Sequence, residues 1–243
     1  MRGILFGDKH SWEDWKLILK ERPDISFPEP KTNYIDLSGS DGQIDLSEVL
    51  TGEVKYKNRV GSFTFTCISD RDKWDLIKTK ISNYLHGKRM KIILDDDRSH
   101  YYIGRFSLNE WVSDKKTGDL VINYDLEPYK YDLTTSTEPW LWDPFSFVEG
   151  VVRNYNQMQI EPETTINLYG SRKTCVPTIT VSTKTGSGFA VYGEYGQSGT
   201  VQWFNLPDGT YKDPDFIIRD GIHPYLFRKN FGTITFDYRG GNL

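Results

Sequence analysis

Histidine and cysteine, which supply most acid–base groups and metal ligands in proteins, are scarce in this sequence. Its 243 residues include 4 His and 2 Cys. No histidine lies in a His-Glu-x-x-His motif and no cysteine in a Cys-x-x-Cys motif, so the sequence gives no support for a zinc site. We expect structural or solvated roles for all four histidines, which are His10, His86, His100 and His223.

The two cysteines, Cys67 and Cys175, lie far apart in the sequence. We interpret both as small buried apolar residues, which fits synthesis in a reducing compartment. A single long-range disulfide between them is left open, because spacing alone does not decide pairing.

Long apolar runs and a basic excess are also lacking. No run approaches the roughly 18 apolar residues that a membrane span needs, and residues 4–6 are too short a run for a signal peptide. We therefore expect a soluble chain without a membrane partner. The net charge is −4, whereas duplex-binding proteins usually carry basic excess. The cluster at residues 88–91, Lys-Arg-Met-Lys, is interpreted as the cationic C-terminal end of a helix.

Motifs that carry catalysis are missing too. Residues 95–97, Asp-Asp-Asp, lack the glycine and the distal glutamate of a calcium loop, and they predict a hairpin turn between two strand-like runs. Residues 186–188, Gly-Ser-Gly, precede a strand pattern and not a helix, so they predict a turn. Residues 196–199 do not match a nucleophile elbow. We therefore predict a protein that is not an enzyme, with no catalytic, cofactor-binding or metal-binding residues and no cofactor.

What the sequence does contain is strand periodicity and aromatic side chains. Aromatic residues make up 14% of the chain, and they bury large apolar areas. Apolar and polar residues alternate at residues 62–67, 165–168, 178–182 and 233–238, which is typical of strands with one buried face. For residues 233–238 we predict an interior or pairing strand, ended by Gly240 and Gly241. The chain is therefore predicted to be mainly β.

Three segments depart from this pattern. Residues 72–85 carry apolar side chains at helical spacing, with Ser69 or Asp70 as the cap at the start and Gly87 at the end. A helical turn or short helix is also predicted from about Ser11 to Lys20. Residues 22–34 contain three prolines, which predict an extended arm that seeks an external partner, with a solvated loop as the alternative.

A change in composition predicts two domains. Residues 134–139, Thr-Thr-Ser-Thr-Glu-Pro, separate a charge-rich segment from a charge-poor one. The predicted domains are residues 1–135 and residues 136–243. In the second, Trp140, Trp142 and Trp203 are candidates for a sugar-stacking platform, although tryptophans in a charge-poor β-sandwich more often serve as core or interface residues.

The order of several short motifs resembles the distal tail proteins of long-tailed, siphovirus-type bacteriophages. None of these motifs is specific alone, but together they span nearly the whole chain. They are residues 6–19, 35–46, 56–59, 63–65, 85–88 and 231–243. The length resembles the short form of the family, without an inserted carbohydrate-binding module.

This resemblance implies a structural virion protein at the distal tip of the tail, made in the host bacterial cytoplasm. It implies an N-terminal β-sandwich-like domain with one α-helix and an extended arm or hairpin, which forms a homohexameric ring, single or in two stacked rings. It implies a C-terminal galectin-like β-sandwich that holds receptor-binding or baseplate proteins.

The ring would join the tail tube protein to the tail-associated protein below it. DNA would pass through its channel without sequence-specific binding. Two alternatives of other classes stay open, a carbohydrate-binding β-sandwich module and a β-jelly-roll hydrolase.

Overall fold

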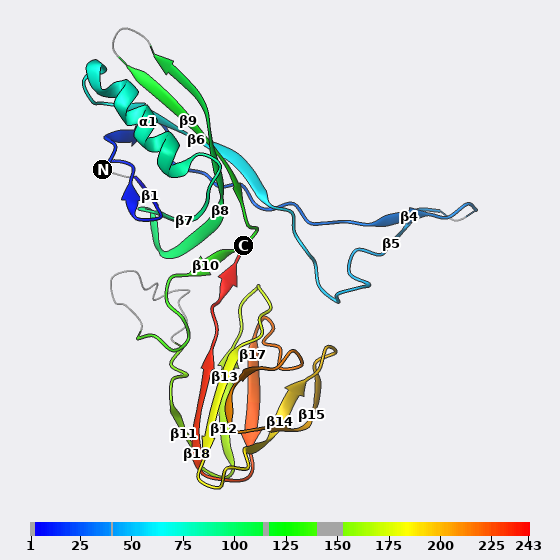
Figure 1. The fold of residues 1–243 in the computed structure, drawn as a ribbon. Coiled ribbons are helices and arrows are strands. Elements are labelled where there is room, and N and C mark those ends of the chain that lie inside the picture. The colour runs from blue at the N-terminus through cyan, green and yellow to red at the C-terminus, as the bar shows by residue number, and fades with distance from the viewer. Residues whose placement is uncertain (1–2, 40, 114–116, 140–152) are drawn as a thin grey trace. The chain divides into compact units, whose positions relative to one another are not determined.

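The protein divides into two compact units. The structure is a computed structural model that describes residues 3–39, 41–113, 117–139 and 153–243. One unit comprises Met1–Lys130 with Leu243, and the other comprises Tyr131–Asn242 (Figure 1). The predicted assignment of residues 1–135 and 136–243 to a ring-forming and a galectin-like domain stays a proposal.

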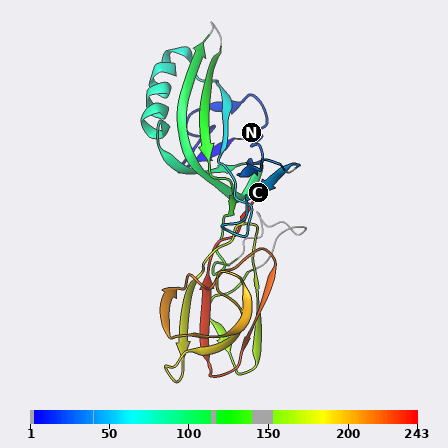
Figure 2. The ribbon, with the colours of Figure 1, turned by 90° about the vertical axis from the view of Figure 1, so that its right-hand side faces the viewer.

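The first unit is built on one antiparallel sheet. Its long strands alternate buried and exposed residues, so that one face closes over a core. Figure 2 shows that these strands are bent along their length. In spatial order the strands are β2 (Lys9–His10), β1 (Ile4–Phe6), β7 (Arg89–Leu94), β8 (Asp97–Ser113), β9 (Gly118–Leu126), β6 (Arg59–Cys67) and β3 (Leu17–Leu19).

The core of this unit is rich in aromatic side chains. Phe6 lies at its centre, 5.4 Å from the ring of Phe106 and 5.8 Å from that of Trp15. Phe63 and Phe65 alternate along β6 as the sequence pattern predicts, and both are buried. Packing of this kind supplies the apolar burial that a chain with few aliphatic residues needs.

Helix α1 (Trp74–Leu85) follows a single 3-10 turn, η1 (Arg71–Lys73), and packs on the same core. Its buried residues are Trp74, Ile81 and Leu85, with Ile77 and Tyr84 partly buried beside them, so the predicted apolar face is confirmed. Gly87 adopts a left-handed conformation at φ 73°, as predicted for the residue that ends the helix.

The predicted side-chain cap of this helix is wrong. Neither η1 nor α1 has a side-chain cap hydrogen bond. The Asp70 carboxylate instead binds the Lys73 ammonium at 2.8 Å, while the indole of Trp74 donates to the Ser69 carbonyl. The 3-10 turn shifts the helix start past the residues that the spacing selected.

The cluster at residues 88–91 only partly fits its interpretation. Helix α1 ends at Leu85, and Arg89 already begins strand β7. Lys88 alone reaches back, because its ammonium donates to the Asn83 carbonyl at 2.8 Å. One cation therefore serves the C-terminal end of the helix.

The helix predicted from Ser11 to Lys20 is limited to one turn. The backbone of Asp14 donates to the His10 carbonyl and that of Lys16 to the Trp12 carbonyl, which is a helical turn. Lys16 then takes a left-handed conformation at φ 56°, and the chain continues as strand β3. Pairing of β3 with β6 outweighs the local helical spacing.

The second unit is a β-sandwich of two antiparallel sheets. Its inner faces carry a separate buried core. One sheet has the order β11 (Met158–Ile160), β18 (Gly232–Asp237), β13 (Thr178–Thr183), β16 (Gly209–Lys212). The other has the order β12 (Thr164–Tyr169), β17 (Ile222–Phe227), β14 (Phe189–Tyr195), β15 (Thr200–Leu206). Two short strands, β10 (Lys130–Asp132) and β19 (Gly241–Asn242), pair with each other.

A stack of three aromatic rings joins the two sheets. Phe216 comes from the segment after β16 and is fully buried. Its ring lies 4.9 Å from Tyr225 on β17 and 5.3 Å from Phe236 on β18, in stacked geometry on each side. A residue outside both sheets thus fills the space between them.

The strand predicted at residues 233–238 is confirmed. Strand β18 lies between β11 and β13, and Ile234, Phe236 and Tyr238 are buried. Its predicted end at Gly240 and Gly241 is wrong, because β18 ends at Asp237 and Gly241 begins the next short strand.

The fold class follows from these observations. The chain is mainly β, with one α-helix in the part of the chain that the structure describes, and its second unit is a sandwich. The helix is too short and too polar to cross a membrane, and no other helix in those residues could do so.

Candidate functional site

The three aspartates at residues 95–97 lie at the predicted hairpin turn, in which Asp95 and Asp96 connect β7 to Asp97, the first residue of β8. Asp95 accepts from the backbone of Gly3 at 2.8 Å and pairs with His10 at 3.1 Å, while Asp96 pairs with Arg22 at 3.2 Å. These carboxylates therefore hold the ends of neighbouring segments together.

Asp97 has a perturbed acid–base equilibrium. Burial opposes its charged form, but the hydrogen bond and charge of His100 and the charge of Lys130 outweigh burial. Together they hold the pKa of Asp97 well below its usual range. The His100 contact is 2.7 Å and the Lys130 contact 3.1 Å. These two ion pairs link Asp97 to His100 on the same strand and to Lys130, so the charges serve a structural role.

The remaining histidines also make hydrogen bonds that hold backbone in place. His86 accepts from the backbone of Leu108 at 3.0 Å. His223 is buried, and its ring nitrogens lie 3.0 Å from the Glu194 carboxylate and 2.9 Å from the Arg219 carbonyl. Over the described ranges, no three His, Cys, Asp or Glu side chains are grouped so as to hold a metal ion. The assignment of no catalytic, cofactor or metal residues stays a prediction.

The cysteines are both free thiols in the structure, with Cys67 buried and Cys175 partly buried. Burial raises the pKa of Cys175 to about 11, so its thiol stays protonated near neutral pH. A protonated, largely enclosed thiol is a weak nucleophile.

The glycine motifs form turns. Residues 186–188 connect β13 to β14, and the Asp208 carboxylate accepts from the backbone of Gly188 and Thr183 there. Residues 196–199 connect β14 to β15. Neither turn precedes a helix, so neither resembles a phosphate-binding loop.

The feature that best qualifies as a functional surface is the arm. It runs from the proline-rich segment through a hairpin of β4 (Tyr34–Asp36) and β5 (Gln43–Asp45), and it extends out from the sheet of the first unit (Figure 1). The predicted extended segment at residues 22–34 is confirmed, since it contains no regular strand before β4 apart from an isolated bridge at Pro30.

The root of the arm is fixed to the first unit. Arg59 is buried, and its guanidinium donates to the Ser26 carbonyl at 2.9 Å and to the Pro128 carbonyl at 2.8 Å. Further out, the two limbs of the arm bond to each other, with Lys31 donating to the Lys55 carbonyl and Lys57 to that of Glu29. The arm is thus ordered at its base, while its tip relies on hairpin bonds alone.

The arm exposes large apolar side chains, most of them at its tip and one, Phe27, near its root. An isolated two-stranded hairpin is marginally stable in water, so a surface of this kind is typical of an interface. The exposed fractions are 85% for Phe27, 52% for Tyr34, 43% for Ile35, 48% for Leu37, 45% for Ile44, 69% for Val49 and 96% for Leu50.

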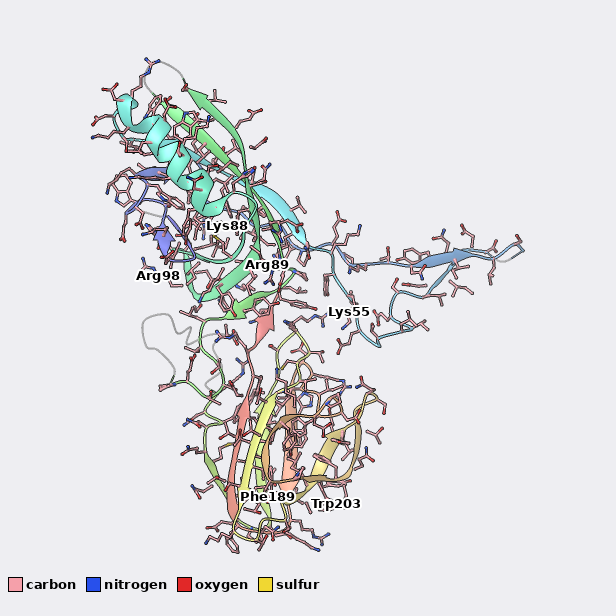
Figure 3. The ribbon with its side chains drawn as sticks, in the orientation of Figure 1. Lys55, Lys88, Arg89, Arg98, Phe189 and Trp203 are labelled. Atoms are coloured by element: carbon pink, nitrogen blue, oxygen red, sulfur yellow. The ribbon has the colours of Figure 1, made fainter. Side chains whose placement is uncertain are left out.

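A second exposed patch lies on the edge strand β15 of the sandwich. Trp203 is 46% exposed, and its ring centroid lies 5.1 Å from that of Tyr192 on β14. The guanidinium of Arg228 lies 5.4 Å over the indole. Figure 3 shows Trp203 at the margin of the second unit. The other two candidates for a sugar platform, Trp140 and Trp142, lie outside the described residues.

Comparisons with known proteins give an informative likeness to a solved structure. No protein-family model matches the chain, and no curated protein matches it. A solved structure does match, under the description "Crystal Structure of SPP1 Dit (gp 19.1) Protein, a Paradigm of Hub Adsorption Apparatus in Gram-positive Infecting Phages". The match has a TM-score of 0.65 at 14% sequence identity and covers 98% of this chain and 99% of that chain. This chain therefore has the fold of the Dit protein over nearly its whole length.

Proposed function

We propose that this chain is a structural hub protein at the distal tip of a bacteriophage tail. The observation that carries the proposal is the likeness to the Dit structure, which covers both units and leaves almost no residue of either chain unmatched. The role described for that protein, a hub of an adsorption apparatus, is the role that we infer here. A fold can serve several functions. The arm, with its exposed apolar side chains, provides support that does not depend on the fold comparison.

In this proposal six copies close into a ring, alone or with a second ring stacked on it. A cyclic assembly needs the same two surfaces on every copy, one that reaches out and one that receives. The arm supplies the first, because it is anchored at its root by Arg59 and exposes apolar side chains at its tip. The first unit would form the ring and its channel, through which DNA passes without sequence-specific binding.

The second unit would hold the neighbouring tail proteins. Its core is complete without a partner, and its outer surface is free to carry a galectin-like role as a platform for receptor-binding or baseplate proteins. The ring would join the tail tube protein above to the tail-associated protein below. The chain would be made in the host bacterial cytoplasm, would reside in the virion, and would act without enzymatic activity.

The test is the mass and shape of the purified full-length chain. Light scattering coupled to gel filtration, from micromolar to millimolar concentration, should give a hexamer or a dodecamer, and negative-stain images should show rings with a central channel. Monomers at every concentration, and still monomers when the tail tube protein is added, would contradict the proposal.

A second candidate function rests on Trp203. Exposed indole and phenol rings side by side are a common surface for stacking on sugars, and Tyr192 and Trp203 are such a pair. Titration of the intrinsic fluorescence with cell-wall oligosaccharides would detect binding. A change that disappears in Trp203→Ala, with the melting temperature kept, would support the carbohydrate-binding module over the hub.

A further inference from the structure

Two segments of the first unit carry opposite charge, and each contains charged residues of one sign only. Residues 32–54, the tip of the arm, contain five acidic residues and no Lys or Arg. Residues 76–94, from the second turn of α1 to the end of β7, contain five basic residues and no Asp or Glu. The acidic residues are Asp36, Asp41, Asp45, Glu48 and Glu53, and the basic residues are Lys78, Lys80, Lys88, Arg89 and Lys91. We call these the acidic tip and the basic segment.

The acidic tip has charge that its own chain does not neutralise. Glu53 pairs with Lys55 at 2.8 Å and Asp45 binds Ser47, both within the arm. Asp36, Asp41 and Glu48 form no ion pair in the described ranges, and all three are exposed. Ile35 and Leu37 flank Asp36 in the sequence, Val49 follows Glu48, and all three apolar side chains are exposed, so the tip combines negative charge with exposed apolar surface.

The basic segment combines exposed positive charge with an exposed apolar side chain. Lys78, Lys80 and Lys88 are exposed, and none of them pairs with a carboxylate within the residues that the structure describes. Arg89 is also exposed and shares its charge with Glu127, while Lys91 lies 4.4 Å from the ring of Tyr101. Leu76, at 56% exposure, adds an uncovered apolar side chain to the outer face of the helix.

The two segments do not meet within one chain. In Figures 1 and 3 the hairpin of β4 and β5 extends away from α1, and Lys88 and Arg89 lie on the body of the unit from which the arm departs. The bonds of Arg59 to the Ser26 and Pro128 carbonyls fix the root of the arm on the first unit. Opposite charges that are kept apart in one copy can meet between copies.

We propose that the acidic tip of one copy docks on the basic segment of a neighbouring copy. This inference rests on the proposed ring and names the two surfaces that join its members. Burial of the apolar residues of the tip against the outer face of α1 would supply most of the affinity. The charges would direct encounter and exclude wrong registers, since individual exposed ion pairs add little. Because a tip and a receiving surface occur once per copy, the contact is head-to-tail, and such a contact forms a ring when the rotation between successive copies closes.

The test reverses the charges in two separate full-length variants. The first, Asp36→Lys with Asp41→Lys and Glu48→Lys, changes the formal charge of the acidic tip from −5 to +1. The second, Lys78→Glu with Lys80→Glu and Lys88→Glu, changes that of the basic segment from +5 to −1. Each variant alone sets like charges against each other, so the concentration of half-assembly, measured by light scattering, should rise roughly tenfold or more.

Mixing the two variants provides the decisive measurement. A basic tip can then dock on an acidic segment and an acidic tip on a basic segment, so rings of alternating copies should form at near wild-type concentration. Six is an even number, which lets such a ring close. A control variant, Glu21→Lys with Glu110→Lys and Glu161→Lys, changes the net charge by the same amount as the first variant at exposed sites elsewhere and should assemble like the parent. Circular dichroism would check that each variant folds.

The possible outcomes distinguish an error in the docking surfaces from an error in the proposed ring. If the parent assembles and the reversals leave assembly unchanged, or if the mixture fails to recover it, the docking surfaces are wrong while the ring stands. If the parent is monomeric under every condition, both fall. If raising the salt concentration strengthens assembly of the parent, charge does not direct the contact, and the inference is again overturned.

Discussion

The two compact units and the arm use large apolar side chains in different ways. In the sandwich, rings such as Phe216 and Phe236 are fully buried between two sheets. In the arm, Phe27 and Leu50 are almost fully exposed at 85% and 96%. Burial of apolar surface is the main stabilising term in folding, so the units supply their own stability. The arm does not, and its side chains are explained by burial in an assembly.

The largest expected effect is removal of the strand that completes the sandwich. Deleting all residues after Gly232 removes Ile234, Phe236 and Tyr238, each worth about 1.5–3 kcal/mol of burial, or roughly 5–9 kcal/mol as an upper estimate. This is comparable to the whole stability of a small domain, about 5–15 kcal/mol. The truncated chain should be insoluble or should melt early, as measured by differential scanning calorimetry.

Two point substitutions near β18 compare the loss of a buried phenylalanine with the loss of an exposed one. Phe236→Ala should cost about 3–5 kcal/mol because Phe236 is fully buried. Phe231→Ala, at a side chain that is 47% exposed, should cost about 1 kcal/mol or less. For the deletion described above, a chain truncated after Gly232 that melts like the parent would show that β18 is dispensable.

The next effect concerns the helix of the first unit. Trp74→Ala should lower the free energy of unfolding by about 3–5 kcal/mol through lost burial and a cavity, and it also removes the indole bond to the Ser69 carbonyl. Lys78→Ala on the exposed face should change it by less than about 0.5 kcal/mol. Urea denaturation of both variants measures the difference. Equal losses would contradict the buried face assigned to α1.

The smallest effect is expected in the arm, where stability and assembly separate. Leu50→Ala should leave the free energy of unfolding of the monomer within about 0.5 kcal/mol of the parent, because the side chain is already exposed. Leu206→Ala, at a fully buried leucine, should cost about 2–5 kcal/mol. If Leu50→Ala destabilises the monomer as Leu206→Ala does, the arm packs against its own chain and the contrast fails.

Much of this fold could be predicted from local pattern. Alternation placed β18, and apolar spacing with a glycine that tolerates a left-handed conformation placed α1. These signals succeed because each depends only on the residues of one strand or helix and on the face that it buries. The predicted caps at Ser69 and Asp70 failed because a 3-10 turn intervenes, and such a turn leaves little trace in spacing.

Features that depend on distant residues could not be predicted. Phe216 lies in a segment without regular structure, and its burial depends on Tyr225 and Phe236 from two different sheets. The helix predicted to Lys20 stopped at Lys16 because β3 pairs with β6, some fifty residues away. The segregation of charge between residues 32–54 and 76–94 is visible in the sequence, but only the fold shows that the two segments point apart.

The position of β18 also has a consequence for how the protein is made. Ser136 is buried, and its hydroxyl donates to the Phe236 carbonyl at 2.7 Å across a separation of 100 residues. In the first unit, the seven strands β2, β1, β7, β8, β9, β6 and β3 are complete once residue 126 has been synthesised. The second has a gap between β11 and β13 until residue 237 emerges from the ribosome, which at about 5–20 residues per second takes several seconds more. During that interval the apolar faces of the incomplete sandwich stay open to chaperones and to neighbouring nascent chains.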